Sequence, residues 1–359
     1  MNFAKLIGQS QGGLALNALT FALLPLVHLA LALLLLGLLT VASLLGFAPY
    51  LPRLLAYFSH FRLQYMVLSF LVFALTLYFG KRYLALWALV LFLLNFAALA
   101  PFYVPYSQAS GERGGERCGE RGGERGGERG GERGGERGAG LSILSWNLYS
   151  KNESHEEVCS HLLAGDWDIL ALMELNGRWE KALSPLWERY PHRYYSKGKS
   201  ELICSRKPLR EIEEKEEREP CKVSRAVDIL WKGKKLRLYL IHLVAGKSEK
   251  SHCSRRKQLE DLKAALVDYG KRGLPLVMIG DFNMSSSCPE YRELLSSFSP
   301  GLRDSRLGFG LQPTWPSFCP LLWIPIDHCF VSEDIVVLDR RTGPSLGSDH
   351  YSLSMLLKL

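Results

Sequence analysis

The sequence predicts helices that span a membrane, followed by a folded domain that combines helices and strands in the α/β or α+β manner. Residues 1–110 contain no Asp or Glu and include long charge-free apolar runs. A Gly-Glu-Arg repeat follows, and beyond it apolar runs alternate with amphipathic stretches, as an α/β protein requires. We therefore divide the chain into an anchor, residues 1–106, a linker, residues 107–140, and a folded domain, residues 141–359.

The anchor contains three apolar runs that predict about three transmembrane helices. Leu23–Phe47 is apolar almost throughout, and it is long enough to cross a hydrocarbon core of about 30 Å as a helix. Leu63–Phe79 and Tyr83–Val104 are two further charge-free stretches, separated by the basic turn Gly80-Lys81-Arg82. A cleaved signal peptide accounts for one such run but not three, and buried core helices are rarely this apolar over this length.

The linker predicts a disordered tether. Residues 111–138 repeat the tetrad Gly-Glu-Arg-Gly, interrupted at Cys118. Because half of these residues are glycine and none is a large apolar residue, the segment cannot recover the entropy lost on ordering. As a flexible coil it would span roughly 30 Å. Each Arg follows a Glu, which favours a linker over an RNA-binding arginine–glycine tract.

Charge and cysteine usage limit the function classes. Of the net charge of +8, residues 1–110 contribute five and the repeat contributes none, which leaves three for the folded domain. A nucleic-acid-binding domain is expected to concentrate Lys and Arg where it meets the phosphates, so this charge distribution weakens the hypothesis that the domain binds nucleic acid. The distribution is still compatible with a local basic patch. The eight cysteines form no C-x-x-C pair, so no tetrahedral zinc site is evident, and their even number permits disulfides.

The folded domain predicts strands wherever short apolar runs are bounded by polar residues. Ser154 with Glu157 forms a capping box that predicts the start of a helix, and Arg256–Tyr269 carries apolar residues at helical spacing. The charge run Glu211–Glu219 predicts a solvated loop or hairpin. The expected strands are Leu141–Leu148, Ile169–Leu175, Leu236–Leu243, Leu276–Ile279, Asp327–Val331, Ile335–Asp339 and Tyr351–Leu357.

Six short segments place Asn, Glu, Asp or His at the ends of these apolar runs. A sheet can hold several polar side chains around one point where its strands end, and carboxylate and amide oxygens suit a hard cation such as Mg²⁺. The segments are Ser145-Trp146-Asn147, Ala171-Leu172-Met173-Glu174, Ile241-His242-Leu243, Gly280-Asp281-Phe282-Asn283, Ile326-Asp327-His328 and Ser348-Asp349-His350.

In this order the six segments resemble the endonuclease/exonuclease/phosphatase superfamily, in a membrane-anchored bacterial form. The resemblance covers residues 141–359. It implies cleavage of phosphate esters with a divalent cation, and a four-layer α/β (α+β) sandwich of two facing β-sheets flanked by helices. In place of Met173, many nucleases of the superfamily have Gln before the metal-binding Glu, which slightly lowers the expectation of a nuclease.

The resemblance also implies a cation site. Glu174 and Asp349 would be metal ligands, and Asn147 would reach the metal directly or through a water. Mg²⁺ is the expected cofactor, with Mn²⁺ as the alternative.

The remaining motif residues would carry the reaction. His350 would act as the general base, and Asp327 would orient its ring and stabilise the imidazolium. Asp281 would handle the nucleophilic water, Asn283 a phosphate oxygen, and His242 would donate a hydrogen bond to the phosphate. The neighbouring His328 would point to the opposite face of its strand, where a structural role is expected.

The anchor and the site together predict a substrate at or near the bilayer, such as a phospholipid head group or a lipid-linked phosphate. The alternative is a nuclease acting on DNA or RNA; a non-catalytic adaptor is disfavoured because the motif set is complete. Trp315 would either line the site or belong to the core. The expected partners are the membrane lipid bilayer and the phosphate-ester substrate, and no obligate protein partner is evident.

The location of the folded domain is predicted by analogy. Lys and Arg flank the predicted spans on both sides, so the positive-inside rule does not decide the orientation, and two crossings within the first run would reverse it. Because the chain resembles membrane-anchored bacterial members of the superfamily, we expect a multi-pass protein of the bacterial inner or plasma membrane. Its folded domain would lie outside the cytoplasm.

Overall fold

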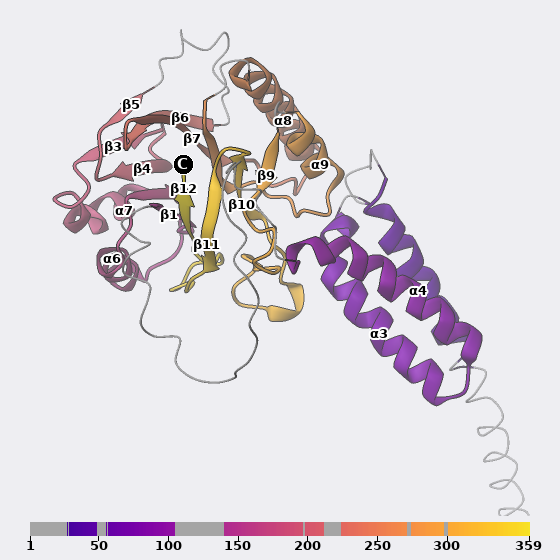
Figure 1. Cartoon of the computed structure of the whole chain (residues 1–359). Helices are drawn as coiled ribbons and strands as arrows, with labels where there is room; N and C mark the ends of the chain where they lie inside the picture. Colours follow the sequence, from indigo (N-terminus) through magenta and orange to yellow (C-terminus); the bar gives the residue numbers. More distant parts are fainter. Residues whose placement is uncertain are drawn as a thin grey trace, which may run out of the picture. The chain divides into compact units, whose positions relative to one another are not determined.

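The computed structural model describes residues 29–48, 57–104, 140–196, 198–211, 224–270, 274–297 and 301–359, together with Val27 and Leu55. They form two compact units: a helical unit that ends at Leu99 and a larger unit, here called the α/β unit, that contains residues 140–359 (Figure 1). The Gly-Glu-Arg repeat and most of the charge run Glu211–Glu219 lie outside the described residues.

In its described residues, the helical unit contains a 3₁₀ helix and three apolar helices. They are Leu29–Leu45, η1 (Tyr57–Phe61), α3 (Arg62–Tyr78) and α4 (Arg82–Leu99). By length and composition, Tyr57–Tyr78 and Arg82–Phe102 are sufficient to cross a membrane, whereas Leu29–Leu45 is shorter. The turn predicted at Gly80-Lys81-Arg82 is confirmed, with Gly80 at a φ of 69°. The number of spans stays a prediction.

The helical unit has an apolar core, but it also buries polar side chains and exposes apolar ones. Asn95 is fully buried, where its Nδ2 donates to Ser43 Oγ at 2.9 Å and its Oδ1 accepts from Arg62 Nη1 at 3.2 Å. The outward faces are apolar instead, so this unit exposes the residue types that a soluble bundle buries. The exposed side chains include Leu34, Leu38, Val41, Phe70, Leu71, Leu75, Leu86, Val90 and Leu93.

Two six-stranded mixed sheets form the centre of the α/β unit. The first has the strand order β11-β12-β1-β2-β4-β3 and the second β5-β6-β7-β8-β10-β9. In each sheet one central pair, β1 with β2 or β7 with β8, is parallel, and the other pairs are antiparallel. The strands of the first sheet are β1 (Leu141–Asn147), β2 (Ile169–Met173), β3 (His192–Tyr195), β4 (Glu201–Ser205), β11 (Val336–Thr342) and β12 (Leu353–Lys358). Those of the second are β5 (Leu209–Glu211), β6 (Ser224–Trp231), β7 (Lys234–His242), β8 (Leu276–Asp281), β9 (Leu302–Asp304) and β10 (Asp327–Ser332).

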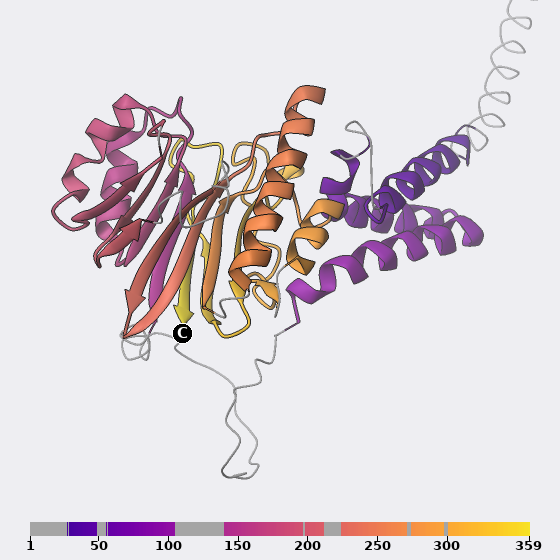
Figure 2. The ribbon, with the colours of Figure 1, turned by 90° about the horizontal axis from the view of Figure 1, so that it is seen from above.

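Helices cover the outer faces of both sheets, so the unit has four layers (Figures 1 and 2). Side chains such as Ile143, Ala171, Leu238 and Ile279 fill the core between the sheets. The outer face of the first sheet packs against α6 (His155–Ala164) and α7 (Gly177–Ala182), and that of the second against α8 (Glu249–Gly270) and α9 (Pro289–Ser296). Two facing mixed sheets with flanking helices are therefore confirmed.

Most predicted elements are present, with shifted ends. A strand occupies each of the seven predicted positions, although β12 begins at Leu353 rather than Tyr351. The helix after Ser154 is confirmed, but the Ser154 side chain makes no capping hydrogen bond. The backbone N–H of Ser154, which a capping box would pair with Glu157, donates to Asn152 Oδ1 at 2.9 Å. Helix α8 begins at Glu249, seven residues before the predicted start. The six described cysteines are free thiols.

Candidate active site

The six motifs meet at one edge of the two sheets because of the strand directions. In the parallel pairs, β1 ends at Asn147 beside Met173, and β7 ends at His242 beside Asp281. The antiparallel strand β10 begins at the same edge, where Asp327 pairs with Asp281. Since β12 pairs antiparallel with β1, the segment that precedes β12 also lies at this edge and supplies Asp349 and His350.

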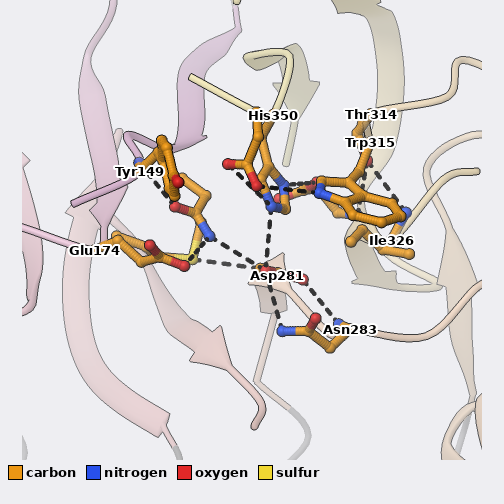
Figure 3. A network of polar contacts seen from close by, with 12 residues as sticks. Tyr149, Glu174, Asp281, Asn283, Thr314, Trp315, Ile326 and His350 are labelled. Carbon is orange, nitrogen blue, oxygen red and sulfur yellow. Dashed lines mark hydrogen bonds and ion pairs between the residues drawn. The ribbon is translucent and has the colours of Figure 1, made fainter. Parts of the chain in front are cut away.

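Asp281 lies at the centre of the network (Figure 3). Its Oδ2 accepts from Asn147 Nδ2 at 3.3 Å and from Asn283 Nδ2 at 3.2 Å, and it lies 3.8 Å from His350 Nε2. The backbone N–H of Asp281 donates to Met173 Sδ at 3.3 Å, which links the two sheets beneath the site. Side chains from both sheets therefore converge on this one buried carboxylate.

Glu174 follows β2 and lies at the more open side of the site. The residue has a φ of 56°, a left-handed conformation that is costly for a residue with a side chain and is typical of functional sites. Its Oε1 accepts from Asn147 Nδ2 at 2.9 Å, and its Oε2 from the N–H of Ser150 at 3.3 Å. Asn147 Oδ1 accepts from the N–H of Tyr149 at 3.0 Å, so the amide presents its nitrogen to the carboxylates.

His350 and Asp327 form a buried pair. His350 Nδ1 lies 2.8 Å from Asp327 Oδ2, which leaves Nε2 directed to Asp281. Burial alone lowers the pKa of His350, but the charges of Asp327 and Asp281 outweigh it and raise the pKa to about 10. Burial, reinforced by the charge of Asp327, raises the pKa of Asp281 above its ordinary value. The neighbouring carboxylates therefore favour the protonated form of the His350 ring, and burial makes the Asp281 carboxylate more basic.

His242 lies between two carboxylates. Its Nε2 is 3.8 Å from Glu174 Oε1, and its Nδ1 is 3.7 Å from Glu201 Oε1. Burial lowers the pKa of His242, but the nearby carboxylates of Glu201, Asp281 and Glu174 raise it above the ordinary value. Glu201 begins β4, a strand that the sequence did not predict, and so it was missed as a partner of the site.

Asp349 links the site to the loop that precedes β10. Its Oδ2 accepts from Trp315 Nε1 at 3.2 Å, and its Oδ1 lies 4.0 Å from His350 Nε2. Thr314 Oγ1 accepts from the N–H of Asp327 at 3.0 Å. Of the two roles expected for Trp315, the one at the site is confirmed by its bond to Asp349.

The structure brings all eight predicted site residues into this one network, whereas His328 points away. Its ring is fully buried on the other face of β10, among Phe282, Tyr291 and Phe330. A supporting residue that the sequence did not suggest is Arg255, whose Nη1 donates to the carbonyl of Asn283 at 2.7 Å. Its only sequence signal was a position near the predicted helix of residues 256–269.

A model of the Endonuclease/Exonuclease/phosphatase family matches residues 144–350, from the first motif to the last. No curated protein sequence matches. Among solved structures, truncated TDP2 from Caenorhabditis elegans is 17% identical with a TM-score of 0.48, over 62% of this chain and 99% of that chain. The 3′-5′ exonuclease NExo from Neisseria meningitidis is 20% identical with a TM-score of 0.48, over 61% and 100%. TDP2 from D. rerio, complexed with a single-strand DNA product, is 18% identical with a TM-score of 0.47, over 62% and 100%.

Proposed function

The chain belongs to the endonuclease/exonuclease/phosphatase family, and we propose that it hydrolyses phosphate esters with a water activated at Asp281 and a divalent cation held by Glu174 and Asp349. Family membership makes the chain a phosphoric ester hydrolase. The observation that carries the finer assignment is the convergence of both sheets on Asp281 (Figure 3).

The donor set fits a divalent cation. Four carboxylates, those of Glu174, Asp281, Asp327 and Asp349, share the site with two histidines, so negative charge is in excess. Among the described residues, the group of three whose ligand atoms lie within 4.8 Å of one another is Asp281, Asp327 and His350, and these residues are buried and already paired. Glu174 and Asp349 have side chains 30% and 28% exposed, which suits a cation that keeps several waters.

Asn147 is assigned a supporting role. Because its oxygen accepts from Tyr149 and its nitrogen faces Glu174, we assign it to orienting that carboxylate rather than to direct ligation. A divalent cation, when bound, would supply positive charge against the phosphoryl oxygens and the leaving group.

Asp281 and the residues around it have different roles in the proposed reaction. Asp281, a stronger base than an ordinary carboxylate, takes the proton of the attacking water, and Asn283 fixes its orientation through two hydrogen bonds. His350 was expected to be the base; its raised pKa favours the imidazolium form, which opposes the charge that develops on the phosphoryl oxygens. Asp327 holds this ring, and His242 donates to the phosphate from the other side.

We propose further that the helical unit tethers the enzyme to a membrane and that its substrate is a phosphate ester at or near the bilayer. The outward apolar faces of the helices and the buried polar cluster at Asn95 support the tether. A second candidate is a nuclease acting on DNA or RNA, which the description of the matching family favours.

The test uses the purified full chain with Mg²⁺ or Mn²⁺ and a soluble aryl phosphate diester and monoester, with plasmid DNA, RNA and phospholipid vesicles in parallel. Activity should disappear with EDTA and return with the cation. Asp281→Asn should lower kcat by about a hundredfold or more, whereas Asp339→Asn, at a half-exposed site on β11, should not. Activity without a metal ion would contradict the proposed divalent cation. Cleavage of DNA without turnover of lipid would favour the nuclease over the lipid phosphoesterase.

A further inference from the structure

One loop at the edge of the site exposes an apolar surface. Residues 307–326 contain no charged residue. Within this stretch Phe318, Leu321 and Leu322 are 74%, 82% and 45% exposed. Among the described residues beyond 140, the exposed large apolar side chains are these three together with Leu230 and Val244. Exposed apolar side chains scattered singly are ordinary, but here three lie within five residues, and clustered exposed apolar surface is a feature of interaction sites.

This loop is attached to the site by direct hydrogen bonds. The N–H of Ser317 donates to the carbonyl of Asp349 at 2.8 Å, and Ser317 Oγ donates to the carbonyl of Ser348 at 2.6 Å. Tyr351 Oη donates to the carbonyl of Ser317 at 3.1 Å. Whatever covers Phe318 is therefore held close to Asp349, the proposed cation ligand.

The composition of the loop favours a lipid–water interface over a polar partner. It combines Trp315, Phe318 and Trp323 with aliphatic side chains and no charge, and aromatic residues of this kind are enriched in the head-group layer. The same chain carries helices with apolar outward faces, which would keep the α/β unit near a bilayer. A lipid surface is thus the apolar phase that this loop would meet most often.

We propose that this apolar rim, residues 317–323, inserts shallowly into the head-group layer and presents the site at Asp349 to phosphate esters of membrane lipids. The inference rests on the proposed phosphoesterase activity and names its substrate class. In this arrangement the rim provides the contact with the bilayer, and the residues around Asp281 provide the hydrolysis.

The first test compares two substrates with the full chain reconstituted in vesicles of phosphatidylcholine, phosphatidylglycerol and phosphatidic acid. In the triple variant Phe318→Ser, Leu321→Ser, Leu322→Ser, release of phosphate or of a phosphorylated head group from the vesicle lipids should fall about tenfold or more, because apolar contact with the membrane is lost. Hydrolysis of a soluble aryl phosphate ester should stay within about twofold, because these residues do not contact the reacting groups.

The control is Leu230→Ser. Leu230 is 65% exposed but pairs with Lys235 near the start of β7, at the opposite end of the sheet from His242. Equal turnover of vesicle lipid by the triple variant and the wild type would overturn the proposed role of the rim. If the wild type does not hydrolyse the soluble aryl phosphate ester, the proposed function is overturned instead. The two failures are therefore distinguishable.

A second measurement locates the rim directly. An environment-sensitive fluorophore is attached to Leu321→Cys or Leu230→Cys in the reconstituted full chain, and the signal of the equally treated wild type is subtracted, since Cys253 is also exposed. Spin-labelled lipids should quench the probe at position 321 but not at 230. A probe at position 321 that enters an apolar environment without lipid quenching would indicate a protein partner, and one that stays in water would indicate no partner; either result overturns the proposal.

Discussion

Trp315 offers the sharpest test of the cation site at the scale of one residue. Its indole N–H donates to Asp349 Oδ2 at 3.2 Å and thereby orients a proposed ligand. Trp315→Phe keeps an aromatic ring but removes the N–H donor, so the Mg²⁺ concentration at half-maximal activity should rise by about tenfold to a hundredfold. At saturating Mg²⁺, kcat should stay within about threefold of the wild type, because the reacting residues are unchanged.

The matched variant is Trp167→Phe, since Trp167 precedes β2 and lies at the opposite edge of the sheet. It should leave the Mg²⁺ titration unchanged. If Trp315→Phe lowers kcat at saturating Mg²⁺ and leaves the midpoint of the titration in place, Asp349 is not a ligand that this indole orients.

His328 predicts a pH dependence of stability that is independent of catalysis. Its ring is fully buried, with Nε2 2.8 Å from the carbonyl of Met284, and burial lowers its pKa to about 4. In the unfolded chain this histidine has an ordinary pKa of about 6.5, so as the pH falls it is protonated there before it is protonated in the folded chain. Its contribution to the free energy of unfolding is therefore complete above that pH and is lost as the pH falls towards 4. The loss should reach about 3 kcal/mol.

The variant His328→Gln keeps a side-chain N–H for Met284 and does not titrate. Urea unfolding at about pH 7 and about pH 5 should show a smaller difference in midpoint for this variant than for the wild type. The same difference in both proteins would assign the acid sensitivity to other groups.

At the scale of elements, the end of β8 requires a glycine. Gly280 has a φ of 141°, and a Cβ added there would lie 2.0 Å from the carbonyl oxygen of Ile241 on β7. Gly280→Ala should therefore destabilise the fold by at least about 2 kcal/mol and also lower activity, because it separates the register partners His242 and Asp281.

The matched glycine is Gly177, at the start of α7, where an added Cβ would meet no atom within 4 Å. Gly177→Ala should be neutral or stabilising by up to about 1 kcal/mol in thermal unfolding. A Gly280→Ala variant as stable as the wild type would show that β7 and β8 can move apart without cost.

The sequence predicted the strands that end at motifs and missed several others. Strands such as β2 and β8 are largely continuous apolar runs because both of their faces are buried. Strand β6 contains Asp228, whose charge is matched across the sheet by Arg237 at 2.8 Å. That compensation depends on the pairing of two strands, so no pattern within β6 alone reveals it. Strands β3 and β4 are short, and β3 carries polar residues at the sheet edge.

The same reasoning explains what the sequence predicted of the site. Eight residues were identified because each lies in a motif next to an apolar run, and strand direction then brings them to one edge. The direction of the Asn147 amide was not predictable, because it depends on the backbone of Tyr149 and on carboxylates of both sheets. Glu201 and Arg255 lie outside the motifs and reach the site only through tertiary packing.

At the scale of the whole molecule, the two units have separate cores. The apolar cluster of the helical unit, which includes Leu36, Val72 and Leu91, contains no residue beyond the helices. The three clusters of the α/β unit and the hydrogen bonds around Asp281 all lie within residues 141–359. Chemistry and tethering are therefore expected to be separable functions of the chain.

This separation gives a prediction for a truncated chain that begins at Ala100 and so keeps the contacts of Phe102 with Gly310 and Arg306. Because its cores and site contacts are complete, it should hydrolyse a soluble aryl phosphate ester within about twofold of the full chain at saturating Mg²⁺. The full chain should stay in the membrane pellet after high-salt and alkaline washes and require detergent for release, because apolar helices rather than ion pairs hold it there. The truncated chain should remain in the supernatant. Release of the full chain by the alkaline wash would contradict the proposed membrane tether. An inactive but folded truncated chain would show that the helical unit contributes to the site.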